Sequence, residues 1–264
     1  MIEPYRSQFR ELLIQGAGTA DVQDLSEPVG FAVPSRGQET WIARELDRVR
    51  VHQTSLCVLL EDVIQRADRI LDVGCGTGAT TVAMALSTRL RPSMVIGLDP
   101  NNASLDAARV RALGHEVPDG RISFEYIEPT CILPQENGKF DLTVSVSAIE
   151  YINDPEMRPV FVSELVRVTR PGGYIYLSTP NPLRFREHHT GRIFGNQIHR
   201  DGYPWANPPW ELNRMFGSCD LIPLGRYFAE RASKRLGLPL PVPIVGSLLP
   251  WFAPWLKILA RKHR

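Results

Sequence analysis

The segment at residues 70–78, I-L-D-V-G-C-G-T-G, constrains the fold more than any other part of this 264-residue chain. Its apolar start predicts a buried strand, and the glycines at 74, 76 and 78 predict a tight turn after that strand. Glycine adopts positive φ without a Cβ clash, so three glycines in one turn let the backbone approach a ligand closely. The segment therefore indicates an α/β fold with a nucleotide-type binding loop. A tight strand-to-helix connection that holds nothing is the alternative.

A second buried strand is predicted at residues 94–99, M-V-I-G-L-D, and it ends in Asp99. A carboxylate at that point can accept hydrogen bonds from two ribose hydroxyls. This indicates a ribose-bearing ligand, of which NAD is one example, without identifying it. Pro100 and Asn101 follow the acid directly. The same Asp99 could instead cap a helix.

Two further motifs follow at characteristic distances from the glycine turn. Phe140 and Asp141 open the predicted strand F-D-L-T-V-S, and R-P-G-G at 170–173 precedes the predicted strand Y-I-Y-L-S. Over about residues 67–182, this order resembles the class I S-adenosylmethionine (SAM) dependent methyltransferases. The resemblance implies a Rossmann-like α/β fold, with a seven-stranded, mostly parallel sheet and helices on both faces. It also implies SAM as the cofactor and methyl transfer as the reaction.

Asp72 separates this resemblance from the dinucleotide-binding alternative. Gly74, Gly76 and Ala79 also fit the looser G-x-G-x-x-A pattern of dinucleotide binders, so an NAD(P)-dependent oxidoreductase remains an alternative. Asp72, however, stands two residues before the first glycine, where that fingerprint normally has an apolar residue. In the methyltransferases the matching acid lies near the methionine end of SAM, which carries positive charge. A noncatalytic SAM-binding or assembly subunit is a second alternative.

The adenine end of the expected site departs from the family pattern. The segment at 122–134 occupies the place where the family often has Gly-Asp-Ala, and the family acid is missing in register. Glu128 stands one residue away and is our candidate acceptor for the adenine amino group. The full set of expected cofactor residues is Asp72, Gly74, Cys75, Gly76, Gly78, Asp99, Pro100, Asn101, Glu128 and Ser145.

Candidate catalytic residues follow the strand at 140–145 and the strand at 174–178. The chain has Glu150-Tyr151 where relatives that methylate quinones often have Glu-His. Tyrosine ligates metals far less often than histidine, so we expect no metal, and Glu150 is a candidate active-site acid. His188 and His189 lie in a long connection on the expected acceptor side. A neutral imidazole is a suitable base for a hydroxyl acceptor, and either histidine can instead be a loop hydrogen-bonder.

The sequence predicts three parts around this motif set. Residues 1–66 are expected to form an N-terminal helical cap, with a Gly- and Pro-punctuated stretch through Gly37 and a helical stretch from about 38 to 66. Tyr5, Arg6, Phe9 and Trp41 are candidates for closing over the cofactor or shaping the acceptor pocket, and surface helices packed on the sheet are the alternative. Residues 67–230 are the expected core, with an acceptor-side insertion at about 183–210, a helix starting near Pro209 and a sixth strand around 220–227. Residues 231–264 are expected to form an apolar, proline-rich extension.

That extension carries no charge from 236 to 256 and ends in R-K-H-R. Five prolines in it would interrupt a membrane-spanning helix, which needs continuous backbone bonding. We expect either an interfacial segment, with Trp251, Phe252 and Trp255 at the headgroup level, or an apolar flap over the substrate pocket. Both alternatives predict a hydrophobic or lipid-linked acceptor, with membrane contact through residues 236–264 in the first.

The net charge and the cysteine pattern bear on the class of partner and on the cellular compartment. The net charge is +1, without the basic excess that nucleic-acid enzymes usually show, so we expect no nucleic-acid partner. The four cysteines form no C-x-x-C pair and no ladder typical of secreted proteins, and no signal peptide is visible. Together with the resemblance, these observations predict a cytoplasmic SAM-dependent O-methyltransferase for a hydrophobic or lipid-linked small molecule. Peripheral membrane association is one of the two alternatives for its C-terminal part.

Overall fold

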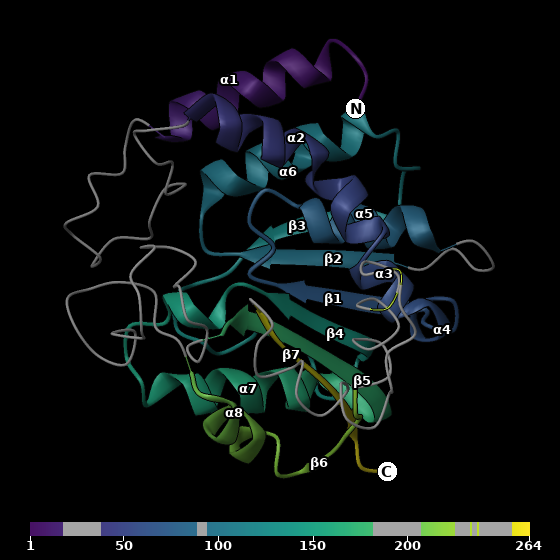
Figure 1. The fold of residues 1–264 in the computed structure, drawn as a ribbon, viewed down its shortest axis with the longest axis vertical. Helices are drawn as coiled ribbons and strands as arrows, with labels where there is room; N and C mark the ends of the chain where they lie inside the picture. Colours follow the sequence, from purple (N-terminus) through teal and green to yellow (C-terminus); the bar gives the residue numbers. More distant parts are fainter. Residues whose placement is uncertain (18–37, 89–93, 182–206, 225–232, 234–236, 238–254) are drawn as a thin grey trace. The chain divides into compact units, whose positions relative to one another are not determined.

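The computed structural model describes residues 1–17, 38–88, 94–181, 207–224, 233, 237 and 255–264. Seven strands form one sheet in the order β3-β2-β1-β4-β5-β7-β6 (Figure 1). Strand β1 pairs in parallel with β2, and β2 with β3, whereas β7 is antiparallel to both β5 and β6. The Rossmann-like fold predicted from the sequence is therefore confirmed. The chain forms two compact units, residues 1–135 with 139–143, and residues 136–138 with 144–264.

The first unit is built on β1 (Arg69–Val73), β2 (Met94–Asp99) and β3 (Ile122–Tyr126). Four of the five residues of β1 are buried, as expected for a parallel strand covered on both faces. Helices α5 (Ala79–Ser87) and α6 (Asn102–Gly114) follow β1 and β2. Strand β4 (Phe140–Val146) begins in this unit, and its Asp141 carboxylate accepts from the backbone N–H groups of Asp68 and Arg69, both at 2.9 Å. The Phe-Asp motif thus fixes the start of β1.

The N-terminal region differs from the sequence prediction in two ways. Residues 5–17 form a helix, α1 (Tyr5–Ala17), where we expected a stretch interrupted by Gly and Pro; residues 18–37 lie outside the described part. The helical stretch expected at 38–66 is divided into α2 (Gln38–Gln53), α3 (Leu56–Leu59) and α4 (Glu61–Ile64). Thr54 and Ser55 hydroxyls bond back to the carbonyls of Arg50 and Val51, which offers the backbone an alternative to a continuing helix.

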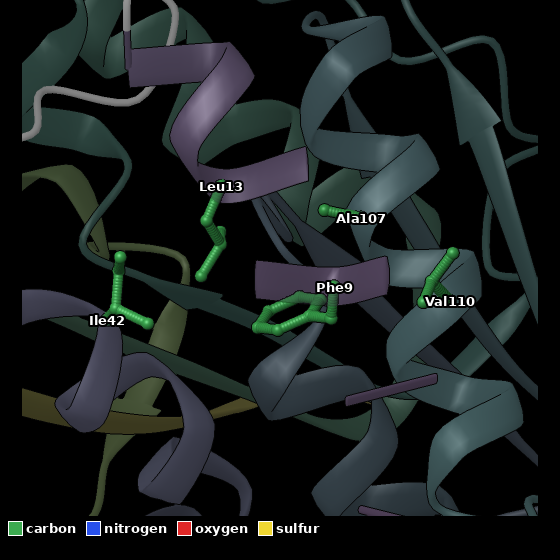
Figure 2. Close-up of a cluster of buried hydrophobic side chains, with 5 residues drawn as sticks. All are labelled: Phe9, Leu13, Ile42, Ala107 and Val110. Carbon is green, nitrogen blue, oxygen red and sulfur yellow. The ribbon is translucent and has the colours of Figure 1, made fainter. Parts of the chain in front are cut away.

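An apolar cluster joins these N-terminal helices to α6. Its buried members are Phe9 and Leu13 of α1, Ile42 of α2, and Ala107 and Val110 of α6 (Figure 2). Phe9 and Leu13 have no exposed surface, and burial of such side chains contributes about 1.5–3 kcal/mol each. Phe9 is therefore a core residue rather than part of a pocket wall, and Figure 1 shows α1 and α2 lying over α6 and α5.

The second unit contains the last part of β4, the 3₁₀ turn η1 (Ile149–Tyr151), α7 (Met157–Val168), β5 (Thr169–Pro180), α8 (Pro209–Met215) and β6 (Cys219–Leu221). The helix predicted near Pro209 is confirmed. Strand β5 begins directly after α7, so R-P-G-G lies inside the strand rather than in a turn before it. Gly172 nevertheless has φ +73°, a conformation that glycine adopts at low cost.

Strand β7 (Trp255–Lys262) lies between β5 and β6, with Tyr174 opposite Arg261 and Pro180 opposite Trp255. We expected residues 231–264 to form an apolar extension, whereas residues 255–262 are a strand of the sheet. The sixth strand expected around residues 220–227 is present as β6, which spans Cys219–Leu221 and is shorter than expected. Lys262 Nζ donates to the carbonyls of Val166 and Thr169, each at 2.8 Å, at the end of α7. A cation there stabilises the carboxyl end of a helix, so this basic residue serves the fold.

Candidate cofactor-binding site

The loop between β1 and α5 has the backbone conformation that its glycines predict. Gly74, Gly76 and Gly78 have φ values of 73°, 51° and 76°. The N–H groups of Gly74 and Cys75 both donate to the Leu98 carbonyl, at 2.8 and 3.0 Å, which fixes the loop to the end of β2. The loop therefore has a backbone conformation in which non-glycine residues would be strained.

Two of these glycines are needed for different reasons. A Cβ on Gly78 would lie 2.7 Å from Cβ of Ala108 and 3.0 Å from the Phe124 ring, so Gly78 allows close packing inside the unit. A Cβ on Gly76 would meet no atom of the described residues within 4 Å. Gly76 thus borders open space, which is what a loop that receives a ligand requires.

Asp99 at the end of β2 is tied to both neighbouring segments. Its Oδ2 accepts from the Gly76 N–H at 2.7 Å, and its Oδ1 accepts from the Asn101 N–H at 2.9 Å. Burial raises the pKa of Asp99, and these two N–H groups lower it. Each carboxylate oxygen has a further lone pair for a ribose hydroxyl. The residue that caps α6 is Asn101, whose side chain accepts from the Ser104 N–H at 2.9 Å, so Asp99 is not that cap.

Asp72 is almost completely buried near the end of β1, with 1% of its surface exposed. Its Oδ2 accepts from the Thr81 hydroxyl at 2.6 Å, whereas its Oδ1 is buried and has no hydrogen-bond partner among the described residues. Burial raises the pKa of Asp72 to about 7, against the lowering effect of the Thr81 hydrogen bond, and the charge of Asp99 raises it further. An unsatisfied buried acceptor costs about 1–3 kcal/mol, and a cationic ligand group would satisfy it.

The Cys75 side chain contributes packing rather than a reactive thiol. A Cβ on Gly97 would lie 2.9 Å from Cys75 Sγ, so the sulfur packs tightly against β2. Burial raises the pKa of this thiol well above its ordinary value, and the charges of Asp99 and Asp72 act in the same direction. Any contact of Cys75 with a ligand in this loop would therefore come from its backbone.

The expected adenine end lies beyond β3, at the same sheet edge as Asp99. Asp99 and Tyr126 are opposite one another in the pairing of β2 and β3, and the Ile127 N–H donates to the Asp99 carbonyl at 3.3 Å. Glu128 is exposed, and its Oε2 accepts from the Tyr126 hydroxyl at 3.4 Å. Pro100 is half-buried directly after Asp99. The positions of Glu128 and Pro100 agree with a ligand that extends from Asp99, and their roles stay predictions.

The remaining expected site residues belong to the second unit or to undescribed segments. Ser145 is 1% exposed, and its hydroxyl has no partner within the described segments. Glu150 is completely buried in η1 and accepts from the Thr179 hydroxyl at 3.1 Å. His188 and His189 lie outside the described residues. Where the structure describes the chain, it holds no group of three His, Cys, Asp or Glu side chains suited to a metal ion.

Sequence reasoning missed a second acid beside the loop. Glu45 of α2 is 3% exposed, and its Oε2 accepts from the Thr77 hydroxyl at 2.8 Å. A usable signal was present, because Glu45 falls at helical spacing between Ile42 and Val49 on the buried face of α2. A charged residue among apolar helix positions is rarely buried without a partner.

Comparisons with known proteins agree with this geometry. Residues 70–173 match a family described as a methyltransferase domain. The chain is 29% identical over 160 residues to a ubiquinone biosynthesis O-methyltransferase from Leptothrix cholodnii. This match covers 59% of this chain and 64% of that protein. The chain is 33% identical over 159 residues to the protein of the same name from Alkalilimnicola ehrlichii, covering 58% and 60%. The matches thus span less than two thirds of these relatives.

A solved SAM-dependent methyltransferase from Aquifex aeolicus shares the fold with a TM-score of 0.55 at 13% identity, covering 83% of this chain and 96% of that chain. The fold, the glycine loop and the family match together define the class of this part of the chain: residues 70–173 match a methyltransferase domain, and the sheet has the fold of the class I SAM-dependent methyltransferases. Residues 70–173 are the methyltransferase domain of the chain, and the cofactor of this domain is SAM.

Proposed function

We propose that the protein transfers the methyl group of SAM to an oxygen atom of a hydrophobic or lipid-linked small molecule. The observation that carries the first half of this proposal is the buried Asp72 oxygen, which lacks a hydrogen-bond partner among the described residues and lies near a loop that these residues leave open at Gly76. The ammonium group of SAM supplies the missing cation. Resemblance to ubiquinone biosynthesis O-methyltransferases supports oxygen as the acceptor atom.

Each part of SAM has a candidate partner in the first unit. Asp72 would receive the ammonium group, Asp99 the ribose hydroxyls, and the backbone N–H groups of the glycine loop the polar groups between them. Glu128 would accept from the adenine amino group. The NAD(P) alternative explains the ribose partner equally well, but it gives no reason for a buried acid at position 72.

Methyl transfer to a hydroxyl requires that the acceptor oxygen is aligned with the methyl group and that the hydroxyl proton is removed. SAM supplies an activated methyl group on a positive sulfur. The protein must hold the acceptor oxygen in line with that group. As the new O–CH₃ bond forms and the S–CH₃ bond breaks, the hydroxyl proton passes to a base, and S-adenosylhomocysteine leaves. His188 or His189 is our proposed base, with Glu150 as a candidate acid.

The acceptor proposal rests on the composition of the C-terminal part and on the relatives. Residues 236–256 are uncharged, and Trp251 and Phe252 lie in the undescribed portion of that stretch. Trp255 and Lys262 belong to β7, so proposed membrane contact is confined to residues before that strand. Over the described residues, the helices are too short or too polar to cross a bilayer.

The direct test is transfer of labelled methyl groups from SAM to a panel of prenylated and unprenylated phenols, with and without anionic vesicles. We expect turnover that increases with acceptor hydrophobicity. His188→Ala and His189→Ala should reduce turnover and leave SAM affinity nearly unchanged. Turnover that both variants retain would remove these histidines as bases. SAM binding without transfer to any acceptor would favour the noncatalytic alternative.

A further inference from the structure

A buried ionic cluster connects α2 and α6 to the glycine loop. Glu45 accepts hydrogen bonds from three side chains: Thr77 at 2.8 Å, Arg111 at 3.0 Å and Arg48 at 2.5 Å. Arg111 Nη2 also donates to the backbone carbonyl of Glu45 at 3.0 Å, and Arg111 has no exposed surface. The guanidinium carbon of Arg111 lies over the Phe9 ring of α1, 4.4 Å from the ring centroid.

The acid at the centre of this cluster, Glu45, is ionised at neutral pH. Burial acts to raise the pKa of Glu45, but the charges of Arg48 and Arg111 and their hydrogen bonds lower it to about 2. Burial lowers the pKa of Arg111 to about 10, against the raising effect of Glu45, so the guanidinium also stays charged at neutral pH. Thr77 therefore donates to a fixed carboxylate, and such charge-assisted bonds are stronger than neutral ones.

Thr77 lies between two glycines of the loop. Its neighbours Gly76 and Gly78 both have positive φ, and glycine samples other backbone regions at little cost. Among the described residues, the other hydrogen bonds that hold the loop are made with the Leu98 carbonyl and the Asp99 carboxylate, at the end of β2. The bond from Thr77 to Glu45 attaches the loop on its other side, to α2.

We propose that Glu45, held in place by Arg111, is a positioning residue that fixes Thr77 and thereby prepares the glycine loop for SAM. This inference rests on the proposed function, because it takes SAM as the ligand of the loop. Without the Thr77 bond, the two glycines sample more conformations, and binding has to order them. Affinity then falls although no contact with SAM is removed.

The sharpest test compares two substitutions of the same residue. Thr77→Val removes the hydroxyl and keeps the branched shape, whereas Thr77→Ser keeps the hydroxyl. Calorimetric titration with S-adenosylhomocysteine should show affinity weakened on the order of tenfold for Thr77→Val, the size expected for a hydrogen bond to a charged group. Thr77→Ser should bind within about twofold of the unsubstituted protein, because the donor remains.

A control on the same helices separates positioning from general stability. Arg10 of α1 and Glu39 of α2 form an exposed ion pair at 2.7 Å, and exposed pairs contribute little. Glu39→Gln should therefore change neither the affinity nor the thermal midpoint. A merely structural role of Thr77 would lower the midpoint and leave the affinity of the folded protein unchanged.

The outcomes distinguish the two levels of the proposal. Thr77→Val with unchanged affinity overturns the positioning role, and so does Thr77→Ser with the same loss as Thr77→Val. Should the valine variant not fold, Thr77→Ala provides the same comparison with a smaller side chain. If the unsubstituted protein itself binds no S-adenosylhomocysteine, the proposed function fails and not merely the role of Glu45.

Discussion

Two buried carboxylates lie near the glycine loop on different elements, and their surroundings are opposite. Glu45 of α2 has two arginine partners, and its pKa is lowered to about 2. Asp72 of β1 has a hydroxyl partner for one oxygen and none for the other among the described residues, and burial raises its pKa to about 7. The protein thus supplies the counter-charge for Glu45, whereas the proposed function assigns the counter-charge for Asp72 to the ligand.

The largest effect should come from closing the loop without touching either acid. Gly76→Arg places a long side chain in the open space and forces a strained φ of +51°. SAM binding should be abolished in a calorimetric titration. Gly120→Arg is the matched control, since Gly120 also has positive φ and open surroundings but lies in the turn before β3. Equal loss of binding in both variants would mean that strain, not occupancy, is responsible.

Removing the charge of Glu45 should lower stability most. Glu45→Gln leaves the buried Arg111 without a charged partner, and breaking such a pair costs about 3–5 kcal/mol. Urea unfolding of the ligand-free protein measures the change in the free energy of unfolding. Asp72→Asn is the comparison and should not lower the free energy of unfolding, because no cationic side chain of the described residues pairs with that acid. Equal destabilisation by both variants would remove the distinction between the two carboxylates.

Asp72→Asn should instead lower the affinity for SAM. Loss of a charge-assisted interaction with the ammonium group should weaken SAM on the order of 10–100-fold. The thermal midpoint of ligand-free Asp72→Asn should first be shown to match that of the unsubstituted protein, so that the titration compares two folded proteins. Undiminished SAM affinity in Asp72→Asn would show that the unpaired oxygen does not receive the cofactor.

The smallest effect concerns pH. The pKa of Asp72 is raised from 3.8 to about 7, so the folded chain binds this proton more tightly than the unfolded chain. Its contribution to the free energy of unfolding should therefore be largest below pH 3.8 and fall as pH rises through about 7. Bound SAM favours the ionised carboxylate, so its affinity should be about tenfold lower at pH 6 than at pH 8. A pH dependence that persists in Asp72→Asn would contradict this assignment.

Local sequence patterns predicted the parts of the first unit that depend on nearby residues. The strand at residues 94–99 has the predicted bounds, and the glycines at 74, 76 and 78 have the positive φ values that their turn requires. Asp99 lies at the loop because strand ends and parallel pairing determine its place. The sequence also offered Asp99 as a helix cap, and only the structure shows that Asn101 has that role.

Long-range pairing explains what the sequence could not predict. Strand β7 pairs with β5 about eighty positions earlier, and nothing in residues 255–262 specifies that partner. The bond between Glu45 and Arg111 joins residues 66 positions apart. The Gly and Pro content before position 38 hid α1, although residues 5–15 contain neither residue type. The roles of Glu128, Ser145, Glu150, His188 and His189 remain predictions.

The most direct test of the central claim is calorimetric titration of the purified protein with SAM, S-adenosylhomocysteine and NADH, alongside Asp99→Ala. We predict that the two adenosyl ligands bind, that Asp99→Ala loses both, and that NADH does not bind. Binding of NADH alone would contradict the account and favour an oxidoreductase. Binding of none of the three would show that this loop, despite its shape, does not receive the cofactor.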